Sequence, residues 1–176
     1  MKRIILALAA CLFLAAAAQA GDIFPDIDLQ GKISPEQRTY LDVPEGPIKL
    51  SDIGADFVLV EVFSMYCPIC QHDAPGVNEM FNQVLASDKA SRIRFVGVGA
   101  GNTPFEVAFY RKKFTVQFPL FEDPNYVAHK AVGNVGTPAY YLIDLRDRKR
   151  ETLLFHEGEI KDKAAFLQQM YALMDK

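Results

Sequence analysis

Apolar runs along the chain predict four strands. The run at residues 57–63 is almost unbroken, as in a central strand that is covered on both faces. Further runs at 93–98, 138–145 and 153–156 predict three more strands. Because only a short charged turn separates the last two, we expect them to be antiparallel.

Apolar residues at helical spacing predict helices between and after these strands. The expected ranges are 68–86, 103–114, 125–132 and 161–174. Pro68 and Pro104 stand at first helical positions, and Thr103 with Glu106 forms a capping box. The expected apolar side of the last helix consists of Ala165, Phe166, Met170, Tyr171 and Met174. Strands that alternate with helices, followed by two adjacent strands and a helix, predict an α/β fold with a mixed sheet.

The N-terminal residues follow a different pattern. A basic start, an apolar run at 4–18 and the small-x-small sequence at 18–20 predict a signal peptide at 1–20, cleaved before Gly21. The apolar run is shorter than the ~20 residues that a membrane-spanning helix needs. We therefore expect export to the bacterial periplasm. The Leu-Ala-Ala-Cys sequence that ends at Cys11 resembles a lipobox, so a membrane-anchored form is the alternative.

Composition and charge narrow the class of protein. The chain has 176 residues, of which 50% are hydrophobic and 23% charged, which is enough for one core. Residues 21–49 are rich in Pro, Gly and Asp and predict an N-terminal extension with a short strand or hairpin, followed by one domain at 50–176. The net charge of -3 argues against a nucleic-acid partner and an anionic membrane surface. We expect a monomer.

Export changes the meaning of the cysteines. Cys11 lies in the predicted signal peptide, so the exported chain keeps only Cys67 and Cys70. In an oxidising compartment this pair can form a disulfide, but closing so short a loop removes little entropy from the unfolded chain. We therefore interpret the pair as a redox-active disulfide that works without a bound cofactor. A structural zinc usually has four ligands, and a second cysteine pair is missing, so we expect no metal.

The two cysteines differ in position. Cys67 stands directly before a predicted helix, where free backbone N–H groups and the helix dipole favour a thiolate. Cys70 follows one turn later, inside the helix. This arrangement predicts that Cys67 is the exposed nucleophile and Cys70 the buried resolving thiol.

Two acidic residues are candidates for moving the proton of Cys70. Glu61 lies within the buried strand, where a raised pKa would suit proton exchange, although an internal salt bridge or a strand-end position that reaches water is the alternative. Asp73 follows Cys70 by three residues, on the same helix face, and could equally be a solvated helix residue. His72 points away from Cys67 around the helix and is expected on the surface.

These motifs resemble the thioredoxin-like proteins. The resemblance rests on Cys-Pro-Ile-Cys after a strand and on Gly-Thr-Pro before the strand at 138–145. Asp73-Ala74-Pro75 and an extra segment at 116–123 are similar to the exported TlpA/ResA type of thiol–disulfide oxidoreductase. The resemblance implies a thioredoxin-like fold, in which helices flank a mixed central sheet with an insertion before the third core strand. It also implies protein thiol or disulfide clients and an upstream electron-donating redox protein.

The resemblance extends to the substrate-binding residues. It implies that the bond between Thr137 and Pro138 is cis and lies against the disulfide, within a substrate-docking loop. Tyr66, Pro68 and Ile69 complete the expected substrate-binding set. Such families usually carry Trp at the position of Tyr66, and only thioredoxins usually carry an acid at the position of Glu61, so both acid positions are filled here.

Two other families share part of the pattern. Ser64 precedes Cys67 by three residues, as in peroxiredoxins, but Val60 stands where their proline would be. Sco-type copper chaperones carry a cysteine pair with one more intervening residue, and His129 lies well before the Gly-Thr-Pro turn where a distal ligand histidine would follow. The two residues between the cysteines include neither a histidine nor a cation that would stabilise the Cys67 thiolate further. We therefore expect the protein to reduce the disulfides of its clients.

Overall fold

A five-stranded mixed sheet forms the centre of the computed structural model, which describes residues 21–176. The predicted signal peptide and Cys11 lie outside the described residues. The strands are β3 (Phe57–Phe63), β4 (Ile93–Ala100), β5 (Leu120–Asp123), β6 (Ala139–Asp144) and β7 (Glu151–Glu157). Their order across the sheet is β5-β4-β3-β6-β7. The β3–β4 and β4–β5 pairs are parallel, whereas β3–β6 and β6–β7 are antiparallel, as predicted for the last two strands.

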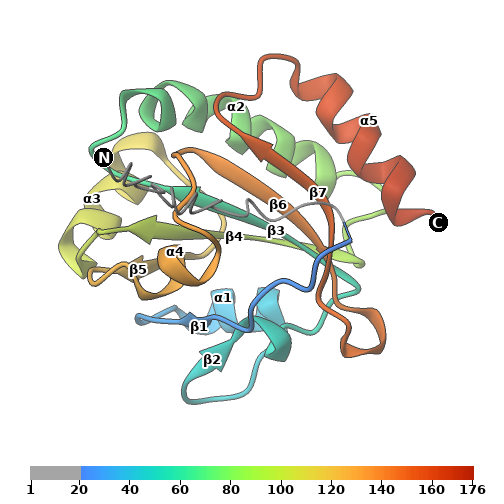
Figure 1. The fold of residues 1–176 in the computed structure, drawn as a ribbon, viewed down its shortest axis with the longest axis horizontal. Coiled ribbons are helices and arrows are strands. Elements are labelled where there is room, and N and C mark those ends of the chain that lie inside the picture. The colour runs from blue at the N-terminus through green and yellow to red at the C-terminus, as the bar shows by residue number, and fades with distance from the viewer. Residues whose placement is uncertain (1–20) are drawn as a thin grey trace, which may run out of the picture.

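Helices and the N-terminal extension cover opposite faces of the sheet (Figure 1). The helices α2 (Pro68–Leu85), α3 (Pro104–Phe114) and α5 (Lys163–Met174) pack on one face. The short helix α4 (Val127–Ala131) and the extension pack on the other. No helix within residues 21–176 has the length and apolar character needed to cross a membrane.

Strand β3 joins the two halves of the core. All seven of its residues are buried, and successive side chains point to opposite faces. Leu59 and Phe63 therefore pack against α2 and α3, whereas Val60 and Val62 pack against the extension. By the same alternation, Glu61 lies on the face covered by α2. The apolar sequence of β3 thus follows from burial on both sides, with one carboxyl group inside the helical half of the core.

The N-terminal extension contains a helix that the pattern of apolar residues did not predict. Its elements are β1 (Asp28–Leu29), α1 (Pro35–Leu41), β2 (Ile48–Lys49) and the 3-10 turn η1 (Leu50–Asp52). The expected short strand is present as β1, which pairs antiparallel with β2. A capping box between Ser34 and Gln37, with Pro35 at the first helical position, begins α1. That box was the available sequence signal.

The extension also pairs with both edges of the central sheet. Ile23 forms an antiparallel bridge with Glu151 on β7, and Gln30 forms one with Glu122 on β5. Edge strands expose unpaired backbone groups that invite aggregation. The extension therefore covers part of each edge.

Three further features of the fold differ from the predictions or add detail to them. β4 continues two residues beyond the expected strand and pairs there with β5, which forms within the predicted insertion before β6. The last two strands are joined by the 3-10 turn η2 (Arg146–Arg148). In α5, Leu167 is buried and Ala165 is exposed, so the predicted apolar side is rotated slightly. The contacts of α5 with α2 decide this rotation, which local periodicity alone does not resolve.

Candidate active site

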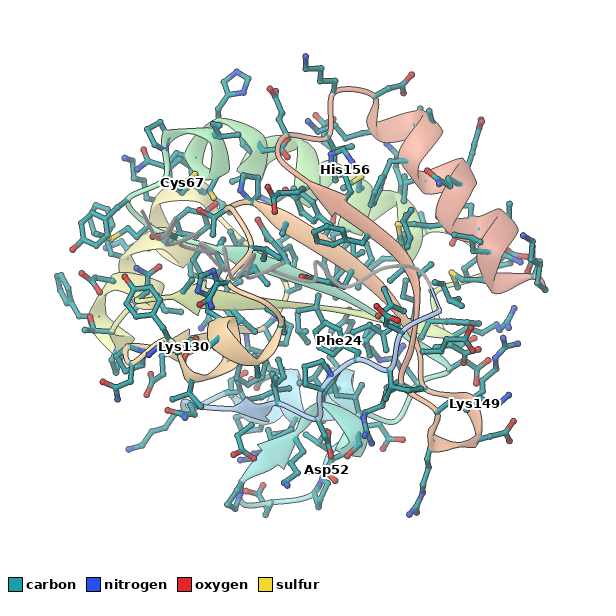
Figure 2. All side chains as sticks on the ribbon, in the orientation of Figure 1. Phe24, Asp52, Cys67, Lys130, Lys149 and His156 are labelled. Carbon is teal, nitrogen blue, oxygen red and sulfur yellow. The ribbon has the colours of Figure 1, made fainter. Side chains whose placement is uncertain are left out.

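Cys67 lies at the N-terminus of α2, where β3 delivers the chain through a three-residue turn. Figure 2 shows it at the start of this helix, at the opposite end of the view from Lys149. Its sulfur accepts a hydrogen bond from the backbone N–H of Cys70 at 3.3 Å, so Cys67 caps the helix. The same sulfur lies 3.1 Å from the carbonyl oxygen of Thr137, to which the thiol donates.

The surroundings of the two sulfurs differ in the way the sequence predicted. Partial burial opposes ionisation of Cys67, but several hydrogen bonds at its sulfur, led by the one from the Cys70 backbone, together outweigh it, and the pKa of the Cys67 thiol is lowered. Cys70 is fully buried, and this burial, together with the nearby Glu61 charge, raises the pKa of its thiol. Both cysteines are free thiols in this structure. A partly exposed thiol of lowered pKa at Cys67 beside a buried thiol of raised pKa at Cys70 is the arrangement of a nucleophile with a resolving partner.

The loop before β6 lies beside Cys67. The Thr137–Pro138 bond is cis, as predicted, and Pro138 is buried. Two contacts hold the preceding residues: Glu157 accepts from the Gly136 backbone at 3.0 Å, and a His129 ring nitrogen lies 2.8 Å from the Val135 carbonyl oxygen. The Thr137 carbonyl is thereby held against the attacking sulfur.

Glu61 is buried without a compensating partner. It is 3% exposed, and its Oε1 atom has no hydrogen-bond partner in the part of the chain that the structure describes. Burial, with a further contribution from the charge of Asp73, raises the pKa of Glu61 to about 8. The raised pKa agrees with the expectation from the sequence, whereas the alternative of an internal salt bridge is wrong.

Asp73 has a different environment from Glu61. Its side chain is fully buried, so the interpretation as a solvated helix residue is wrong. It accepts hydrogen bonds from the Tyr140 hydroxyl at 2.8 Å and the Ile160 backbone at 3.2 Å, and it forms an ion pair with Lys163. The structure therefore brings both predicted acids into the core near the cysteines, with one paired and the other unpaired.

The remaining predicted site residues lie on the surface around Cys67. Tyr66 and Ile69 are among the exposed large apolar side chains, and Pro68 is exposed between the cysteines. The Tyr66 hydroxyl donates a hydrogen bond to Glu106, which also caps α3 by accepting from the Thr103 backbone at 2.7 Å. Tyr66 is thereby linked to the start of α3, and an apolar rim surrounds the nucleophile.

Four residues near the site were not identified as site residues from the sequence. They are Glu106, Tyr110, Tyr140 and Lys163. Glu106 was recognised only as a helix cap, and the two tyrosines belong to segments that were interpreted as core. Nothing local in the sequence marks Lys163, which meets Asp73 across 90 positions. These partners depend on helix packing and not on a motif.

The histidines take no part in this cluster of groups. His72 is exposed, as predicted, and lies 3.1 Å from the Glu159 carboxylate. His129 supports the loop before β6, and a ring nitrogen of His156 lies 3.1 Å from the Glu159 carbonyl oxygen. Among residues 21–176, no group of three or more His, Cys, Asp or Glu side chains is placed to hold a metal ion.

Several solved structures are similar to this chain. A protein assigned as thiol:disulfide interchange protein DsbE from Chlorobium tepidum is 27% identical over 89% of this chain and 98% of its own, with a TM-score of 0.68. A secreted disulfide oxidoreductase from Mycobacterium tuberculosis is 16% identical over 72% and 89%, with a TM-score of 0.58. StoA from Bacillus subtilis is 16% identical over 70% and 88%, with a TM-score of 0.57.

These similarities confirm the thioredoxin-like fold and the likeness to the TlpA/ResA kind that the sequence predicted. No curated protein matches the sequence significantly. The family model described as "AhpC/TSA family" matches residues 20–152, which is well over half of the chain. The chain therefore belongs to the AhpC/TSA family, whose members are redox-active and thioredoxin-like.

Proposed function

We propose that the chain is an exported thiol–disulfide oxidoreductase that reduces disulfides in protein clients through Cys67 and Cys70. The observation that carries the proposal is the contrast between the two sulfurs: Cys67 caps α2 with a lowered pKa, and Cys70 is buried with a raised one. Support also comes from the Chlorobium protein, which is assigned to thiol:disulfide interchange, and from the Mycobacterium protein, which is described as secreted.

The first step is attack by the Cys67 thiolate on a client disulfide. A bond forms between the Cys67 sulfur and one client sulfur, the client S–S bond breaks, and the second client sulfur leaves as a thiolate that takes up a proton. The Thr137 carbonyl and the exposed rim of Tyr66, Pro68 and Ile69 are suited to hold the client chain beside the sulfur. The product is a mixed disulfide.

The second step releases the client. Cys70 loses its proton to the Glu61 carboxylate and attacks the Cys67 sulfur, which forms the Cys67–Cys70 disulfide and frees the second client thiolate. The client gains two electrons and the protein loses two. Glu61 suits this role because its Oε1 is buried without a partner, and its charge is felt at Cys70.

Turnover requires an upstream dithiol that returns two electrons to the Cys67–Cys70 disulfide. This disulfide is the redox group, and the scheme uses no bound cofactor. The Pro-Ile pair between the cysteines supplies no further charge to stabilise the thiolate, which favours a reducing protein over a strong oxidant. An exported form with a lipid at Cys11 would carry out the same chemistry at the membrane surface.

An assay of insulin reduction with dithiothreitol as electron donor tests the proposal. We expect the protein at catalytic concentration to accelerate the reaction, and Cys67→Ser to abolish the acceleration. Peroxide consumption and copper(I) titration on the same preparation test the two alternatives, a peroxiredoxin and a Sco-type copper chaperone. The proposal is wrong if insulin reduction is not accelerated while peroxide is consumed or copper(I) is bound tightly.

A further inference from the structure

Two buried carboxylates lie near one another between β3 and α2, and their partners differ. Asp73 receives two hydrogen bonds and the ammonium group of Lys163. Glu61 Oε1 receives none from any residue in the range 21–176. A carboxylate stays charged in a protein interior only where a cation and donors compensate it. The two acids therefore differ in how far their surroundings compensate a negative charge.

Lys163 reaches Asp73 past a glycine of α2. A Cβ atom on Gly76 would lie 2.2 Å from Cε of Lys163 and 3.0 Å from its Nζ atom. Gly76 follows Asp73 by three residues on the same side of the helix. Glycine inside a helix is destabilising relative to alanine. Because position 76 carries no side chain, the Lys163 side chain has room to pass across α2 and reach Asp73. Residues of both α2 and α5 therefore accommodate this ion pair.

Building on the proposed function, we propose that Lys163 is a positioning residue of the redox site: by pairing with Asp73 it offsets the Asp73 charge at Glu61, and so sets the pH range in which Glu61 exchanges a proton with Cys70. Lys163 acts on Glu61 electrostatically, through the Asp73 carboxylate. Burial is the main reason that Glu61 resists ionisation, and the Asp73 carboxylate adds to it. The ammonium group of Lys163 lies against that carboxylate, so it should offset part of the Asp73 effect. Loss of the lysine must therefore raise the pH at which Glu61 ionises, and loss of Asp73 must lower it.

Several elements bring titratable or charged groups close to Glu61. The titratable and charged groups that face it or its partners are Cys70 and Asp73 from α2, Tyr110 from α3, Tyr140 from β6, His156 from β7 and Lys163 from α5. Burial raises the pKa values of Cys70, Tyr110 and Tyr140. His156 lies beyond Tyr140, with ring centroids 6.3 Å apart. Unlike Cys70, Tyr110 and Tyr140, Glu61 has a pKa of about 8 and ionises in that range.

Reaction of the reduced protein with Ellman's reagent separates the two thiol steps. The Cys67 thiolate attacks the reagent and releases one nitrothiobenzoate, leaving a mixed disulfide. Attack by Cys70 then releases a second nitrothiobenzoate, and this second rate should rise as Glu61 ionises. Stopped-flow absorbance across a pH series gives a midpoint for each phase. The first phase, which depends on Cys67, is an internal control.

The expected changes of the second-phase midpoint follow from charge. Lys163→Met should raise it by roughly one pH unit, the lower end of the effect of an opposite charge nearby. Asp73→Asn should lower it, and the variant with both substitutions should return toward the wild-type midpoint. Lys163→Arg keeps the charge and should restore the wild-type profile. A purely structural role would change stability or rates but would leave the midpoint in place.

Gly76→Ala tests the same idea with the lysine still present. The added methyl group displaces Lys163 from Asp73, so the second-phase midpoint should rise, while the better helix former keeps the fold. An unchanged or lowered midpoint in both Gly76→Ala and folded Lys163→Met would overturn the role of Lys163. If Glu61→Gln shows the wild-type second-phase midpoint, Glu61 is not the proton acceptor of the proposed function, whatever the role of Lys163. If the wild type releases no second nitrothiobenzoate, the proposed function itself is wrong.

Discussion

The Tyr110 hydroxyl of α3 donates a hydrogen bond to the Cys70 carbonyl oxygen at 2.9 Å. This contact ties α3 to the first turn of α2, at the residue that serves as the resolving thiol in the proposed mechanism. Tyr110 is fully buried, and its ring stacks on Phe63 at the end of β3, with ring centroids 4.5 Å apart. One side chain therefore links β3, α2 and α3 where the two cysteines are placed.

Tyr110→Phe keeps the ring and removes the hydroxyl. We expect the free energy of unfolding to fall by about 1 kcal/mol, the typical net contribution of one hydrogen bond. The Cys70 carbonyl should stay within the helical hydrogen bonds of α2, so the fold should survive. Urea denaturation followed by circular dichroism measures the change, and a loss above about 3 kcal/mol would show that the hydroxyl has a larger role.

Cys70→Ser should trap a mixed disulfide between Cys67 and a client, because the resolving thiol is missing. Cys67→Ser should trap none, since the buried thiol of Cys70 has a raised pKa and is inaccessible. Non-reducing electrophoresis of exported extracts shows the trapped species. The matched control is the reduced wild type treated with iodoacetamide: alkylation of Cys70 before Cys67 would reverse the assignment of the two thiols.

Burial of Glu61 predicts how stability depends on pH. Its pKa is raised by folding to about 8 from the lower value of the unfolded chain. Such a group favours the folded state fully below the unfolded pKa, and this contribution is lost as pH rises through the folded pKa. The unfolding free energy of the wild type should therefore fall between about pH 5 and pH 8, by roughly 1.4 kcal/mol for each step of one pH unit.

Glu61→Gln is the matched control for that dependence, because the amide does not ionise. Its unfolding free energy should vary less between about pH 5 and pH 8 than that of the wild type. Chemical denaturation at several pH values gives both curves. Parallel curves would show that Glu61 ionises normally, and would transfer the proton-exchange role to Asp73 or to water.

The exported protein should begin at Gly21. The small-x-small sequence at 18–20 predicts cleavage there. Mass spectrometry of the protein from a periplasmic extract measures the first residue. A mature chain that begins at a lipidated Cys11 would contradict the signal-peptide prediction and favour the membrane-anchored alternative.

Much of the fold could be predicted from local patterns. The apolar run at 57–63 became β3 with the same bounds, and the helix predicted after Cys67 became α2. These elements depend on neighbours a few positions apart, on helix caps and on proline at first turns, all of which are visible in one segment. The motif of Cys67 and Cys70 before a Gly-Thr-Pro turn was likewise visible, because its chemistry follows from its place at a helix start.

Tertiary structure decided how the surroundings of the two acids, Glu61 and Asp73, differ. The sequence left both Glu61 and Asp73 as candidates for the acid beside Cys70, and it contains no sign that Lys163 pairs with one of them. The energy of a buried charge depends on which donors and cations surround it, and those come from α5 and β6, far along the chain. The sequence by itself determined four of the five strands of the central sheet, most of the helices and the pair of thiols. Only the packing of α5 on α2, past Gly76, decided that Asp73 has a cation, whereas Glu61 Oε1 has no partner among residues 21–176.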